Sequence, residues 1–166
     1  MTRKNWLKYV SELDELVRSG RGSEVRRRLM SERRRKMPGD VRIQVANIAR
    51  RSGLPLLSLQ ILRPLVNKER VSVRTPEKTP TLAVNQEQQA AWASYGAGLI
   101  AIGALDEGRA FLDRVNADEY PEILLTSSIG FFKEWDYGPS VPLLKRFIAS
   151  ANITDYQRLV GQVNLA

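Results

Sequence analysis

The 166-residue chain contains neither cysteine nor histidine. Without cysteine there can be no disulfide bridge, thiolate metal site or cysteine nucleophile. Without histidine the chain lacks the residue that most often acts as a general acid or base near neutral pH. Zinc sites are disfavoured too, because carboxylates alone rarely hold zinc. The composition therefore argues against an enzyme, and we expect no catalytic residues, no metal and no cofactor.

Long apolar runs are scarce as well. The wholly apolar run Leu99–Ile102 reaches only Leu105 when Gly103 is counted, whereas a membrane-spanning helix needs about 20 residues. The N-terminal segment has basic residues but no apolar core of a secretory signal. Gly and Pro together make up 19 residues, so no large part is typical of a disordered linker. We expect a cytoplasmic protein with no membrane partner.

Positive charge is concentrated in the first third of the chain. Residues 1–52 hold 15 Lys or Arg against 6 Asp or Glu, a net charge of +9, while residues 53–166 hold 11 against 12. Such asymmetry indicates an anionic partner for the first third, or a strongly solvated face.

Hydrophobic periodicity predicts helices almost throughout. Apolar residues recur three and four apart, as in Trp6, Tyr9, Val10, Leu13, Leu16 and Val17. Thr154 before the apolar set of the last segment is typical of a helix start. Strand signals are poor, and the segment "TPEKTP", Thr75 to Pro80, cannot continue a helix. It predicts a Pro-rich insertion at about 73–87.

An internal repeat emerges from the glycines that follow helical stretches. Gly20 and Gly53 are 33 residues apart, and Gly103 follows 50 residues later, which is one repeat plus the insertion. A fourth turn lies near Tyr137. The resulting units span about 6–38, 39–72, 89–121 and 122–153, with a terminal helix at 154–166, and all belong to one helical-repeat domain.

The third unit carries a family resemblance. Trp92-x2-Tyr95-Gly96-x2-Leu99, followed by Gly108-x3-Leu112 and Pro121, resembles the tetratricopeptide repeat in spacing, although several identities differ. The resemblance implies an all-α fold, a right-handed superhelix of antiparallel helical hairpins, that is, an α-solenoid. Other α-hairpin arrays would fit nearly as well.

The glycines of this unit favour packing over chemistry. Gly96-Ala-Gly98 with Gly103 does not form the Gly-x-Gly-x-x-Gly pattern, and no strand signal precedes it. Small residues are instead needed where two helices cross closely. We expect Gly96 to face Gly108 at such a crossing.

In the family that the chain resembles, the first helix of each hairpin lines a concave groove that holds a partner peptide. The resemblance carries this role to Ile43, Asn47, Arg50, Arg51, Ala93 and Ala97. An Asn near Arg side chains could hold a carboxylate or a peptide backbone. The alanines of the third unit predict a smooth apolar stretch suited to a helix or strand.

A basic cluster lies within Glu24–Lys36. It comprises Arg26, Arg27, Arg28, Arg33, Arg34, Arg35 and Lys36. Three interpretations stay open: phosphate contacts with nucleic acid, an acidic protein surface, and a solvated outer helix. No aromatic residues interleave with the cluster, so base stacking is not indicated.

Two features near the C-terminus complete the hypothesis. The aromatic group Phe131, Phe132, Trp135 and Tyr137 is more typical of a core than of a binding surface. The segment 154–166 is less polar than a capping helix, so either the natural chain continues beyond Ala166, or this end docks on a partner or on another copy. We expect a protein-interaction scaffold or adaptor; the alternative is a nucleic-acid-binding or regulatory helical module.

Overall fold

A computed structural model describes residues 2–31, 37–67 and 86–166. The helices are α1 (Arg3–Arg18), α2 (Gly22–Ser31), α3 (Gly39–Arg51), α4 (Pro55–Val66), α6 (Gln86–Ile102), α7 (Leu105–Leu112), α8 (Glu122–Lys133), α9 (Ser140–Ala149) and α10 (Asp155–Leu165). These ranges contain no strand, which confirms the all-α expectation. The Pro-rich insertion lies almost wholly outside the described residues.

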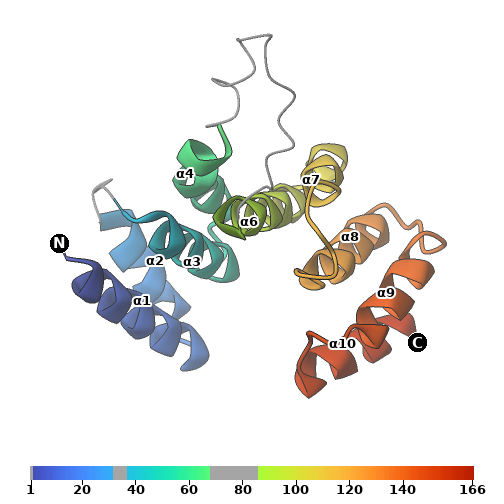
Figure 1. Cartoon of the computed structure of the whole chain (residues 1–166). Coiled ribbons are helices and arrows are strands. Elements are labelled where there is room, and N and C mark those ends of the chain that lie inside the picture. Colours follow the sequence, from blue (N-terminus) through green and yellow to red (C-terminus); the bar gives the residue numbers. More distant parts are fainter. Residues whose placement is uncertain (1, 32–36, 68–85) are drawn as a thin grey trace, which may run out of the picture.

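Extensive contacts join only helices that are first or second neighbours in this order. Each helix packs on the next, from α1 on α2 to α9 on α10. In addition, α1 contacts α3, α3 contacts α6, and α6 contacts α8. Figure 1 shows the outcome, an arch that begins at α1 and ends at α10, with α4 and α7 on its outer side. The helices α1, α3, α6 and α8 therefore form a row of neighbours.

The close approach of α6 and α7 confirms the crossing expected from their glycines. A Cβ atom added at Gly96 would lie 3.0 Å from the carbonyl oxygen of Gly108 and 2.7 Å from Leu112 Cδ2. A Cβ atom at Gly108 would lie 3.2 Å from the Gly96 oxygen. Because Gly96 and Gly98 sit inside α6, they form no phosphate-binding loop.

The turns after α1, α3 and α6 share one hydrogen-bonded form. After α6, for example, Ala104 N–H donates to Leu99 O (3.0 Å) and Gly103 N–H donates to Ile100 O (3.2 Å). This Schellman motif needs a residue in the left-handed conformation just after the helix, and glycine adopts that conformation without steric cost. Gly103 has φ +89° there. The glycines on which the predicted repeat is based, Gly20, Gly53 and Gly103, are therefore helix-ending residues.

Helix α10 begins as its sequence predicts. Gln157 N–H donates to Thr154 Oγ1 (3.2 Å), and Thr154 N–H donates to Gln157 Oε1 (2.8 Å). These reciprocal bonds form a capping box, which satisfies two backbone donors at the helix start. On its other side α10 leaves apolar side chains exposed, namely Tyr156, Leu159 and Val163.

Two members of the aromatic group at the end of α8, Trp135 and Tyr137, contradict their expected place in the core. The exposed fractions of Trp135 and Tyr137 are 80% and 52%, while Phe131 and Phe132 are half-buried. Trp135 follows the end of α8, where the chain turns outward before α9 begins. The space between α8 and α9 is instead occupied by residues within the helices, such as Leu124 and Phe147.

Candidate partner-binding groove

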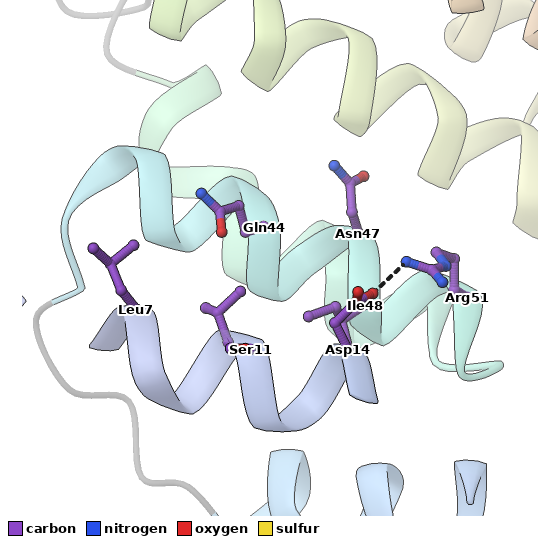
Figure 2. A pocket seen from close by; sticks show the side chains of 8 residues that line it. Leu7, Ser11, Asp14, Gln44, Asn47, Ile48 and Arg51 are labelled. Carbon is purple, nitrogen blue, oxygen red and sulfur yellow. Dashed lines mark hydrogen bonds and ion pairs between the residues drawn. The ribbon is translucent and has the colours of Figure 1, made fainter. Parts of the chain in front are cut away.

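A hollow of about 360 Å³ lies between α1 and α3, the first helices of the two N-terminal hairpins (Figure 2). Eight residues line it: Leu7, Val10, Ser11 and Asp14 from α1, and Gln44, Asn47, Ile48 and Arg51 from α3. Both sets are spaced three and four apart, so each forms one stripe along its helix. We refer to this hollow as the α1–α3 groove.

The groove combines an apolar base with polar groups that face solvent. Val10 and Ile48 are buried and belong to the N-terminal core cluster. The side-chain amides of Gln44 and Asn47 have no hydrogen-bond partner among the residues that the structure describes. Figure 2 shows both amides at the rim of the groove. Such groups can donate to and accept from the main chain of a bound segment.

One ion-pair network closes one end of the groove. Arg51 donates to Asp14 across the two helices at 2.9 Å, and Arg18 approaches the other oxygen of Asp14 at 2.7 Å. Partial burial of Asp14 opposes its ionisation. The hydrogen bond from Arg51 and the charge of Arg18 outweigh that effect and hold the pKa of Asp14 below its ordinary value. The ion pair between Asp14 and Arg51 thus links α1 to α3.

Arg50 adds a positive charge that has no counter-ion among the described residues. Its Nε atom is buried and lacks a hydrogen-bond acceptor within the described part of the chain. Desolvation lowers the pKa of Arg50, and the neighbouring Arg51 lowers it further. A cation in this state is stabilised by any anion that reaches it. This end of α3 therefore favours an acidic group on whatever binds.

The six groove residues expected from sequence separate into two groups. Asn47 and Arg51 line the groove and Arg50 adjoins Arg51, as just described. Ile43 and Ala97 are buried, at 9% and 8% exposed, and Ala93 packs half-buried against the C-terminal core cluster. Ile43 contacts a cluster with Leu62 and Ala91, because α3 turns this face toward α4 and α6. Ile43 and Ala97 therefore expose little surface to a partner.

The contribution of α1 to the groove was missed by sequence reasoning. Its core residues are Trp6, Val10, Leu13 and Leu16. The neighbouring stripe of Leu7, Ser11 and Asp14 carries no motif of its own. Only the pairing of α1 with α3 in the structure identifies it.

The described part of the basic cluster is largely engaged within the fold. Arg26 Nε donates to the backbone oxygen of Ser52, and Arg28 pairs with Glu24 at 2.9 Å and with Glu12 at 3.4 Å. Arg28 also holds the pKa of Glu24 below its ordinary value. Arg27 is exposed without an ion pair to any described residue. Arg33, Arg34, Arg35 and Lys36 lie outside the described residues.

Two further kinds of site are not found in the structure as described. Among residues 2–31, 37–67 and 86–166, no three acidic side chains gather in a way that could hold a metal ion. None of the helices in these ranges is long and apolar enough to cross a bilayer.

Comparison with known proteins gave no relative. No protein-family model, no curated protein and no solved structure matches the chain. The geometry of the groove therefore carries the functional argument.

Proposed function

We propose that the chain is a protein-interaction scaffold that holds a peptide or helix of a partner along its row of first helices. In this proposal the hairpins form a right-handed α-solenoid of the tetratricopeptide kind, and the α1–α3 groove is the principal contact. The observation that carries it is the groove itself, with an apolar base and two side-chain amides free to bind a main chain.

The charge beside the groove narrows the class of partner. Arg50 is half-buried and has no counter-ion in the described part of the chain, and Asp14 is already shared between two arginines. An incoming carboxylate would gain a charge-assisted hydrogen bond from Arg51, which lines the groove, whereas an incoming cation would be repelled by Arg51 and by its neighbours Arg18 and Arg50. We therefore propose an acidic peptide as the occupant.

We assign no catalytic step to the groove. A cytoplasmic location stays a prediction from sequence.

The alternative of nucleic-acid binding has less support. A phosphate-binding stripe needs several uncommitted cations. Within the described part of α2, Arg26 and Arg28 are bound to other groups of the chain, and Arg27 is the one arginine of the three without a hydrogen bond or ion pair to a described residue.

Filling the groove provides the test. Ser11 is exposed on α1, so Ser11→Trp should leave the fold intact while its indole occupies the hollow. Ser23→Trp, at an exposed position of α2, is the matched control. In affinity capture from a native lysate at low and moderate salt, wild type and Ser23→Trp should capture the same proteins. Ser11→Trp should no longer capture them.

Two results would contradict the proposal. One is capture that Ser11→Trp leaves unchanged. The other is capture of nucleic acid, with an affinity that falls steeply as the salt concentration rises and that is lost when Arg27 and Arg34 are both replaced by Glu. That result would establish the nucleic-acid alternative. Bulky substitution at Ala97 is unsuitable as a test, because that side chain is buried and overpacking would disturb the fold.

A further inference from the structure

Trp135 occupies a backbone position that glycine fills in the other hairpins. After α8, Asp136 N–H donates to Phe131 O and Trp135 N–H donates to Phe132 O, both at 3.1 Å, which repeats the motif that ends α6. The residue in the left-handed conformation is glycine after α1, α3 and α6, but here it is Trp135, with φ 60°. A bulky side chain in this conformation carries a steric cost that glycine avoids.

Packing does not compensate for that cost. Trp135 is 80% exposed, whereas Trp6 and Trp92 are 1% and 4% exposed. A large apolar side chain in water contributes little to folding, since the hydrophobic effect scales with the area removed from solvent. Strained, exposed residues of this kind are typical of functional positions rather than structural ones.

The surrounding contacts hold Trp135 in place. Arg109 donates to both oxygens of Glu134, the preceding residue, at 2.6 and 3.1 Å, and its guanidinium lies 4.6 Å from the centre of the Phe131 ring. The Tyr137 ring lies 5.6 Å from the Phe132 ring and 6.4 Å from the Trp135 ring. The indole is thus presented from a turn whose neighbouring residues are held by these contacts.

Charge indicates what this turn would bind. Residues 134–138, Glu-Trp-Asp-Tyr-Gly, alternate acidic and aromatic side chains and contain no base. Glu134 is neutralised by Arg109, but Asp136 is exposed and has no ion pair to any described residue. Aromatic faces attract cations, most often arginine, and a carboxylate beside the ring adds a counter-ion.

We propose that Trp135, Asp136 and Tyr137 form a second binding site that takes an arginine side chain on an extended segment of a partner protein. The guanidinium stacks on the open face of the indole and pairs with Asp136. The site is independent of the α1–α3 groove, which favours an acidic occupant. The excess positive charge of the chain lies in residues 1–52, while residues 53–166 hold 11 Lys or Arg against 12 Asp or Glu, so the part of the chain that carries this site has no excess positive charge to repel a cationic segment.

The probe is a blocked Gly/Ser peptide with two arginines, compared with the same peptide carrying citrulline, which keeps the shape but not the charge. Fluorescence anisotropy of the labelled peptides measures affinity as the full chain is titrated. The arginine peptide should bind about fivefold more tightly or better, the ratio that about 1 kcal/mol of cation–π energy gives. It should also protect fluorescence from acrylamide quenching, because Trp135 is the exposed tryptophan.

The Trp135→Gly substitution distinguishes a role of Trp135 in arginine binding from a role in the stability of the fold. It removes the ring and restores the residue that the turn favours, so the thermal midpoint should stay the same or rise while the arginine peptide binds no better than the citrulline peptide. Asp136→Asn should weaken arginine binding with the fold unchanged. Tyr156→Ala, which removes an equally exposed aromatic from α10, is the matched control and should bind as wild type does.

The proposal is overturned if arginine and citrulline peptides bind equally. It is also overturned if Trp135→Gly lowers the thermal midpoint and leaves the arginine preference intact, which would assign Trp135 a structural role.

Discussion

At the scale of single residues, Asp14 sets the electrostatics of the groove. It lies 2.7 Å from Arg18 on its own helix and 2.9 Å from Arg51 on α3. The side chain of Asp14 is 24% exposed and that of Arg51 is 46% exposed. Solvent therefore screens the ion pair, and its contribution to the free energy of unfolding is modest. Its effect should nevertheless appear in the pH dependence of stability.

Arg51→Gln should destabilise the chain at neutral pH but not in acid. The folded pKa of Asp14 is lowered below 3.8. A depressed acidic pKa contributes stability above the unfolded value, and this contribution is lost as pH falls through the folded value. The difference in unfolding free energy between wild type and Arg51→Gln should therefore be largest above pH 3.8 and shrink below it. Urea unfolding at about pH 6 and about pH 2.5 measures it.

Arg63→Gln is the control for charge removal, since Arg63 is exposed on α4 with no ion pair to a described residue. It should show no comparable pH dependence. An Arg51→Gln penalty that persists in acid would mean that Arg51 acts by packing and not through Asp14.

The turn glycines make a second prediction at this scale. A Cβ added at Gly103 meets no atom within 4 Å, so Gly103→Ala tests the left-handed conformation alone. It should destabilise the fold by about 1 kcal/mol. Gly138→Ala, in the α8–α9 loop without a positive φ, should be close to neutral. Equal effects of the two substitutions in urea unfolding would contradict the conformational explanation.

At the scale of elements, the α6–α7 crossing depends on the absence of side chains. Gly96→Val should destabilise the fold by about 2 kcal/mol, because its Cβ would overlap Leu112 and the backbone of Gly108. Gly22→Val at the start of α2 meets open space and serves as the control in the same unfolding experiment. A small effect at Gly96 would mean that α7 can shift outward without loss.

The same element shows why sequence predicted some features and not others. Gly96, Gly108 and Gly103 have roles that follow from local sterics, so their spacing was sufficient to predict them. Trp135 shows the opposite case, because its apolar character indicated burial while a turn geometry that sequence does not display exposes it. The prediction that Ile43 lines the groove failed for a related reason, because its side chain packs against α4 and α6. Periodicity defines an apolar face but does not say which neighbouring helix covers it.

At the scale of the whole molecule, the described residues contain separate core clusters. One joins α1 and α2 to α3, a second joins α3 to α4 and α6, and a third extends from Val66 on α4 to Phe147 on α9. Extensive contacts do not reach beyond second neighbours. Stability in such an arrangement is approximately a sum over units and their interfaces, so damage at one end should stay near that end.

Two buried residues at opposite ends test this directly. Phe147 on α9 and Leu13 on α1 are both 0% exposed, and their replacement by Ala should each cost about 3 kcal/mol or more. In native-state hydrogen exchange, Phe147→Ala should speed exchange in α8, α9 and α10 while α1 to α3 keep their protection, and Leu13→Ala should give the mirror result. A single cooperative core would instead lower protection everywhere to the same extent for either variant. Selective loss at the near end is expected because no extensive contact links α1 or α2 to α8, α9 or α10, so unfolding one terminal hairpin leaves the other with its stabilising neighbours.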